Sequence, residues 1–182
     1  AEIAATGDRV LVLEDTVELQ CAARDHVPLR TRAGVVSMTE LVRSSMRLRP
    51  DRVVVGEVRG AEALDLIKVW GTGHPGGIAT IHAGSALGAL LRLEQLILEV
   101  AVNPPRALIA EAVNVVIHIA GRGRKRRIES IARIVGFDGV GYQLADWEAD
   151  AMDAPFPELP PAPFAAEIAA PSLSPDQPGE LP

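Results

Sequence analysis

The chain has 182 residues, which is about the length of one domain. Apolar residues make up 48% and charged residues 23%, but aromatic residues only 3%, so Leu, Ile, Val and Ala must build the core. No uninterrupted apolar run approaches the roughly 18 residues needed to cross a bilayer, which excludes a membrane-spanning helix. The single cysteine, Cys21, excludes a disulfide framework.

The formal net charge of −6 is unevenly distributed. Residues 149–182 carry six acidic residues and no Lys or Arg, so residues 1–148 hold 18 acidic and 18 basic groups. Nine prolines between 155 and 182 also disfavour regular structure there. We therefore expect a folded domain over 1–148 and a disordered acidic, Pro/Ala-rich tail over 149–182, with a docking segment as the alternative for the tail.

Strand and helix patterns alternate along residues 1–148. Short apolar runs predict buried strands at 8–14, 52–56 and 78–82. Capping residues and apolar periodicity predict helices from Ser37 to about Leu48, over 61–70, over 85–100 and from Pro104 to about Ala112. Two strands at 115–120 and 128–137 follow, joined by a tight basic turn, with 142–144 as a third. This alternation predicts an α/β fold with a largely parallel sheet.

Polar, titratable residues follow three of the predicted strands. Glu14 and Asp15 end the first strand, Glu57 follows the second, and His82 ends the third. Each alone is consistent with an ordinary polar strand end or a capped turn. Because ligands of open α/β sheets bind beyond the carboxyl ends of the strands, the three together indicate a binding or catalytic edge.

The loop around the third strand is rich in glycine. Residues 71–77 contain four glycines, and His74 and His82 bracket the strand. Close approach of backbone to a ligand is one interpretation, and a glycine loop with a core histidine is the other. The histidine spacing does not match a zinc site. No G-x-x-x-x-G-K-[ST] phosphate-binding loop occurs in the printed sequence.

Residues 122–127 contain five cations in six positions. Contact with nucleic acid or anionic lipid is one interpretation of this run. It has no aromatic stacking partners and lies between two strand patterns, which favours a solvated hairpin turn. We therefore expect no direct nucleic-acid binding.

Taken together, three of these segments resemble the secretion and conjugation traffic ATPases of type II secretion, type IV secretion, conjugation and type IV pili. Residues 14–19 resemble the acidic "Asp box" of that superfamily, residues 48–60 its atypical Walker B motif ending in Glu57, and residues 72–83 its "His box". Within the superfamily, residues 18–23, 62–66 and 109–116 are most similar to the conjugal transfer branch of type IV secretion.

The resemblance implies a RecA-like P-loop NTPase core, a homohexameric ring, ATP and Mg²⁺. It implies that Glu57 activates the attacking water and helps hold magnesium, with Glu14 and Asp15 assisting. It also implies that His82 lies near the γ-phosphate. The resemblance gives four further candidate cofactor-binding residues, without a separate role for each: His74, Arg47, Arg49 and Arg59. It implies that the arginines serve either charge compensation or inter-subunit contact.

The family further implies a cytoplasmic location, peripheral to the inner membrane, with components of the secretion or conjugation machinery as partners. Members carry a P-loop upstream of the matched region. We therefore expect this chain to be the C-terminal part of a longer ATPase, and hydrolysis by this chain alone does not follow. The alternatives are a non-catalytic assembly module and a type II secretion or pilus motor of the same superfamily.

Overall fold

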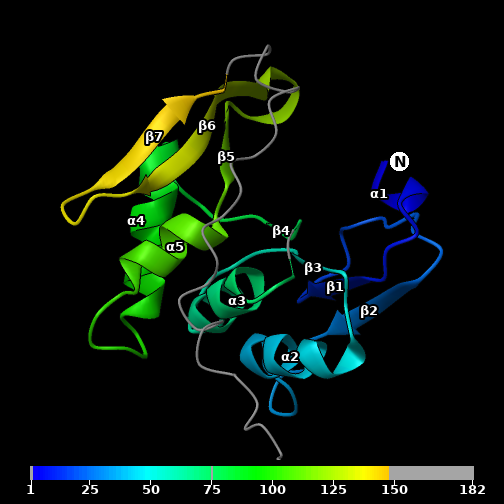
Figure 1. Cartoon of the computed structure of the whole chain (residues 1–182). Helices are drawn as coiled ribbons and strands as arrows, with labels where there is room; N and C mark the ends of the chain where they lie inside the picture. The colour runs from blue at the N-terminus through cyan, green and yellow to red at the C-terminus, as the bar shows by residue number, and fades with distance from the viewer. Residues whose placement is uncertain (1, 75, 148–182) are drawn as a thin grey trace, which may run out of the picture. The chain divides into compact units, whose positions relative to one another are not determined.

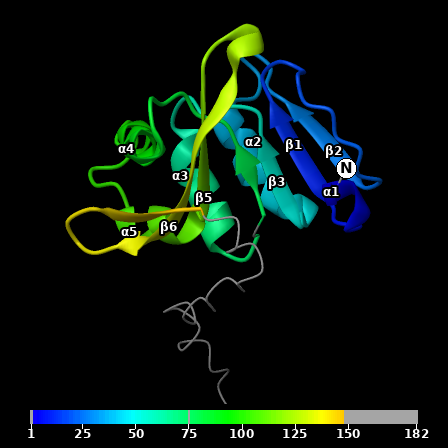
Figure 2. The same cartoon turned by 90° about the horizontal axis from the view of Figure 1, so that it is seen from above.

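The computed structural model describes residues 2–74 and 76–147, excluding the side chains of residues 2 and 4 (Figure 1). After the short helix α1 (Glu2–Ala5), a parallel sheet forms in the order β2-β1-β3-β4 (Figure 2). Its strands are β1 (Val10–Glu14), β2 (His26–Arg30), β3 (Arg52–Val55) and β4 (Ile78–Ala79). Leu13 pairs with Val55, and Val55 with Ala79. The carboxyl ends of β1, β3 and β4 therefore lie level with one another at the same edge of the sheet.

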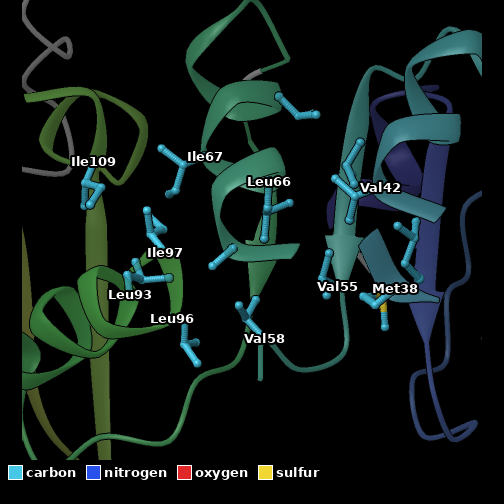
Figure 3. Packing of buried hydrophobic residues seen from close by; sticks show 14 of the residues in the cluster. Met38, Val42, Val55, Val58, Leu66, Ile67, Leu93, Leu96, Ile97 and Ile109 are labelled. Atoms are coloured by element: carbon cyan, nitrogen blue, oxygen red, sulfur yellow. The ribbon is translucent and has the colours of Figure 1, made fainter. Parts of the chain in front are cut away.

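Successive residues of the central strands point to opposite faces of this sheet. Leu11 and Leu13, with Val53 and Val55, enter the main core. The helices α2 (Met38–Ser45) and α3 (Glu62–Gly71) pack on that face. Figure 3 shows Val55 of β3 in this core with side chains of both helices. A smaller cluster on the other face contains Val10, Val12 and Ala23.

The start of α2 is fixed by the predicted capping box. The Ser37 hydroxyl accepts the Glu40 backbone N–H at 3.3 Å, and the Ser37 backbone N–H donates to the Glu40 carboxylate at 2.7 Å. A 3₁₀ turn, η1 (Met46–Leu48), continues the helix. Arg49 then adopts a left-handed conformation with φ of 51°, and Pro50 follows, so the chain leaves the helix and enters β3.

A second layer of structure follows β4. Helix α4 (Ala86–Ile97) begins at Ser85, whose hydroxyl accepts the Gly88 N–H at 3.0 Å. Helix α5 (Arg106–Ala112) and an antiparallel sheet in the order β5-β6-β7 complete it. The strands of that sheet are β5 (Val115–Ala120), β6 (Arg127–Phe137) and β7 (Tyr142–Asp146). Figure 1 shows the three-stranded sheet beside α4 and α5. Ile109 of α5 and Ile134 of β6 belong to the main core, so this sheet packs into the same cluster as the helices.

Most predicted elements are confirmed, and the differences have local causes. β2 was not expected, because Pro28 lies within it. Proline is tolerated there since β2 is an edge strand. β4 is shorter than the predicted strand 78–82, and β7 extends to Asp146. The predicted parallel sheet is confirmed, and the last three strands form an antiparallel sheet of their own. The short turn η2 (Gly123–Lys125) lies between β5 and β6, as the basic turn predicted.

The predicted tail over 149–182 and its boundary at 148 lie outside the described residues. Within 2–74 and 76–147, no helix is long and apolar enough to cross a membrane.

Candidate functional site

Glu57 lies just beyond the carboxyl end of β3. The residues on either side of it are hydrogen-bonded to β1 and to the segment that follows β4. The Gly56 N–H donates to the Leu13 carbonyl at 2.8 Å, and the Val58 N–H donates to the Thr80 carbonyl at 2.9 Å. The Thr80 hydroxyl donates to the Gly56 carbonyl at 2.6 Å. The backbone on both sides of Glu57 is therefore held in place, so the position of its side chain is set by the sheet.

The Glu57 carboxylate contacts one basic group on each oxygen. Oε2 accepts a hydrogen bond from the Arg59 guanidinium, and Oε1 lies 3.2 Å from Nε2 of His82. The hydrogen bond from Arg59 has the largest effect on the pKa of Glu57 and lowers it. Burial has the second-largest effect and raises the pKa, and the charges of Arg59 and His82 lower it by smaller amounts. The His82 side chain is 95% exposed, so it remains accessible beside the carboxylate.

Arg59 joins this carboxylate to the end of β1. One guanidinium nitrogen bonds Glu57, and another lies 3.8 Å from Oδ2 of Asp15. The other oxygen of Asp15 accepts the Thr31 hydroxyl at 2.6 Å, at the end of β2. The carboxyl ends of three neighbouring strands thus contribute to one connected cluster of charged and polar groups.

Glu14 lies at the same edge but in a different environment. It is buried, and its Oε1 accepts the backbone N–H groups of Glu18 and Leu19 at 3.0 and 2.8 Å. A β-carbon at Gly56 would come 3.3 Å from Glu14 Cγ, so the two strand ends are in close contact. Through these hydrogen bonds, Glu14 fixes the backbone of the loop that follows β1.

Three other candidates from the sequence are not brought to this cluster. The Gly76 carbonyl accepts a bond from Arg52 at 3.4 Å, which places the His74 loop at the amino end of β3, opposite Glu57. Arg47 and Arg49 also precede the amino end of β3 and are exposed. Among the described residues, no ion pair or hydrogen bond of their side chains is present.

Sequence reasoning missed two residues that shape the site. Thr31 was not recognised because it follows β2, the strand that was not predicted. Glu62 is buried, and its Oε1 accepts the backbone N–H groups of Arg59 at 2.7 Å and Gly60 at 2.9 Å. An acidic residue in the first turn of α3 was a usable signal for this, because such residues bind free backbone N–H groups.

The donor set at this edge consists of carboxylates and a histidine. Carboxylate oxygens are ligands that Mg²⁺ accepts, but it usually keeps several waters and binds phosphate oxygens as well. Within the part of the chain that the structure describes, no three His, Cys, Asp or Glu side chains are grouped as a metal cluster. Glu57 and Asp15 therefore fit a magnesium ion held mainly through water and phosphate, rather than one enclosed by protein.

A parallel sheet with this carboxyl-edge cluster defines an α/β protein with a RecA-like core. A solved relative with the same fold is the VirB11 ATPase of the Brucella suis type IV secretion system, in complex with sulphate. It is 31% identical, with a TM-score of 0.62, over 69% of this chain and 40% of that one. The chain belongs to the Type II/IV secretion system protein family, whose model matches residues 1–128.

Curated relatives point to the conjugation branch of the family. The conjugal transfer protein TrbB of Rhizobium radiobacter is 49% identical over 140 residues, which are 77% of this chain and 43% of that protein. The type IV secretion system protein PtlH of Bordetella pertussis is 35% identical over 68% of this chain and 41% of its own length. The chain thus spans less than half the length of these relatives.

Proposed function

We propose that this chain is the C-terminal part of an ATPase domain that powers conjugative transfer through a type IV secretion system. The observation that carries the proposal is the Glu57 carboxylate, fixed by the sheet at the ligand-binding edge and kept ionised by Arg59. The 49% identity to a conjugal transfer TrbB supports the conjugation branch over type II secretion and pilus motors.

In this proposal Glu57 orients the attacking water and accepts its proton. An ionised carboxylate at a fixed position is the group such a step requires. His82, exposed and 3.2 Å from Glu57, contacts the terminal phosphate. Arg59 offers a positive charge that stabilises the negative charge on the phosphoryl oxygens in the transition state.

Magnesium, when bound with ATP, supplies charge neutralisation at the phosphates. Glu57 and Asp15 are the side chains that would hold it, through water. Glu14 supports them indirectly, because its carboxylate fixes the loop that carries Asp15. No G-x-x-x-x-G-K-[ST] motif occurs in the printed sequence, so the proposal assigns no phosphate-binding loop to these 182 residues.

The proposal includes a homohexameric ring that works on the cytoplasmic side of the inner membrane with the conjugation machinery. The exposed Arg47 and Arg49, at the edge opposite Glu57, are proposed to contact a neighbouring copy. The family resemblance supports the ring, and the absence of partners for these two side chains among the described residues supports the contact.

The test uses an extended protein in which the upstream part of the Rhizobium radiobacter TrbB is joined to this chain. It should hydrolyse ATP with magnesium, whereas the 182-residue chain alone should hydrolyse none. Glu57→Gln should reduce turnover by a factor of about 10² to 10⁴ without weakening ATP binding, because the charge acts mainly in the transition state. The measurements are steady-state phosphate release and titration with a fluorescent nucleotide.

Glu111→Gln, an exposed carboxylate on α5, is the matched control and should leave turnover unchanged. Near-normal turnover of the Glu57 variant would remove Glu57 from the catalytic role. An inactive extended protein that still assembles would favour the second candidate, a non-catalytic assembly module, which the missing phosphate-binding loop of this chain already supports.

A further inference from the structure

Arg59 lies between two acids that are each anchored a second time. Glu57 uses one oxygen for Arg59 and the other for His82. Asp15 uses one oxygen for Arg59 and the other for Thr31. Since both acids have their own second contact, neither depends on Arg59 for its position. The guanidinium is therefore the member of the cluster that can leave without displacing the others.

The backbone of Arg59 is fixed although its side chain is exposed. The buried Glu62 carboxylate accepts the N–H groups of Arg59 and Gly60, which holds the turn after β3. The Arg59 side chain is nevertheless 64% exposed. Only its side-chain torsions need to change for the guanidinium to exchange one anionic partner for another.

We propose that Arg59 acts as a clamp on Glu57 and that a polyphosphate competes with Glu57 for it. Without phosphate, the Arg59 guanidinium holds the Glu57 carboxylate in an ion pair. With phosphate, the guanidinium leaves the carboxylate and binds the phosphate oxygens. This inference rests on the proposed function, and it adds a regulation of the same site. Glu57 is released to act on water only once a phosphate chain has taken its place on Arg59.

Physical chemistry favours this exchange of partners. A guanidinium binds phosphate oxygens with two parallel hydrogen bonds, whereas the pair with Glu57 uses one. A polyphosphate also carries more charge than a carboxylate.

The clamp is tested on the full 182-residue chain with inorganic tripolyphosphate as the probe. Binding is followed by the side-chain NMR signal of Arg59, assigned with Arg59→Lys, at constant ionic strength. The internal carboxylate and the phosphate compete for one guanidinium. Glu57→Gln should therefore tighten tripolyphosphate binding about three- to tenfold, and Asp15→Asn should tighten it less, because its contact is longer. Arg59→Gln, followed by the side-chain NMR signal of the neighbouring His82, should abolish binding at this site.

Two controls separate the clamp from general charge effects. Glu18→Gln removes the same charge near Arg59 without breaking a direct contact, and should change the affinity less than about twofold. Arg43→Gln removes a similarly exposed, acid-paired arginine on α2 and should leave the affinity unchanged. Equal tightening by the Glu57 and Glu18 variants, or an Arg59 signal that tripolyphosphate does not move in any variant, would overturn the clamp.

The clamp and the proposed function fail separately. If the Glu57 variant of the extended protein loses turnover but Glu57→Gln does not tighten tripolyphosphate binding, the ATPase assignment stands and the clamp is wrong. If tripolyphosphate binding behaves as described but the extended protein does not hydrolyse ATP, the phosphate-responsive clamp stands without the catalytic role.

Discussion

Two glutamate–arginine pairs in this chain serve different ends. At the edge of the parallel sheet, Glu57 and Arg59 form an exposed pair with exchangeable contacts. Between α4 and α5, Glu94 is 8% exposed and both its oxygens lie 3.0 Å from Nε of Arg106. The pKa of the nearby Tyr142 hydroxyl is raised by burial and by the Glu94 charge. The Glu94 pair therefore joins α4 to α5 through a buried carboxylate, whereas the Glu57 pair leaves the side chains of Arg59 and His82 open to solvent.

The largest expected difference is in the stability effects of the two glutamates. Glu94→Gln should lower the free energy of unfolding by about 2–3 kcal/mol, because a buried amide then replaces the charged partner of Arg106. Glu57→Gln should cost less than about 1 kcal/mol, because water can replace its contacts. Urea denaturation of both variants measures this, and equal losses would contradict the comparison.

Glycine substitutions at the two regions should also differ. Gly121, at the end of β5, has φ of +87°, and a β-carbon there would meet the Lys125 carbonyl oxygen at 2.2 Å. Gly121→Ala should cost about 1–3 kcal/mol, because backbone must move. A β-carbon at Gly56 would meet the Glu14 side chain at 3.3 Å and the Leu13 carbonyl oxygen at an ordinary 3.6 Å, so Gly56→Ala should cost less than about 1 kcal/mol. Thermal unfolding of both variants is the measurement, and the reverse order would contradict the geometry.

The contribution of the Glu57–Arg59 pair to the stability of the fold should decrease as the pH falls. Because Arg59 lowers the pKa of Glu57 below its usual 4.5 in the folded chain, the pair stabilises the fold above that pH. The contribution is lost as the pH falls through the lowered value. Arg59→Gln should therefore lower the melting temperature by no more than about 3 °C at pH 7, and by progressively less as the pH falls below 4.5.

A scan of melting temperature against pH, for the wild type and Arg59→Gln, tests this. Arg43→Gln is again the control, since its partner Asp65 belongs to an exposed pair on α2 and α3. If the difference in melting temperature between the wild type and Arg59→Gln grew as the pH fell, Arg59 would not stabilise the ionised form of Glu57.

The smallest effect is expected for the basic turn at 122–127. Every side chain in this run is exposed. Replacing its five cations with Ser should leave the melting temperature almost unchanged, because no buried contact is lost. Loss of a salt-sensitive DNA affinity in that variant, measured at two ionic strengths, would instead support a nucleic-acid role.

Much of the fold could be predicted from local patterns. The capping residues Ser37 and Ser85 start their helices as expected, and the apolar runs of β1 and β3 are buried strands. β2 was missed because its alternating exposure and Pro28 are typical of a loop as well as of an edge strand. Its role as a strand depends on pairing with β1, a contact 16 residues away in sequence.

The site was predicted in outline but not in its connections. Glu57, Asp15 and His82 were correctly expected at one edge, because parallel strands end there. The sequence assigned Glu14 and Asp15 the same task, yet Glu14 bonds the loop backbone while Asp15 faces Arg59. Adjacent residues of a strand point to opposite sides, and only the packing around each decides which one water reaches.

Apart from β2, the sequence by itself determined the order of strands and helices, the carboxyl-edge position of Glu57 and the family, because these follow from local periodicity and from motif spacing. Only the tertiary structure decided that Arg59 joins Asp15 to Glu57, that His74 lies at the opposite edge, and that the last strands form a separate sheet. The reason is that ion pairs and strand partners depend on distances between segments remote in sequence, which the alignment of β1 with β3 and β4 fixes.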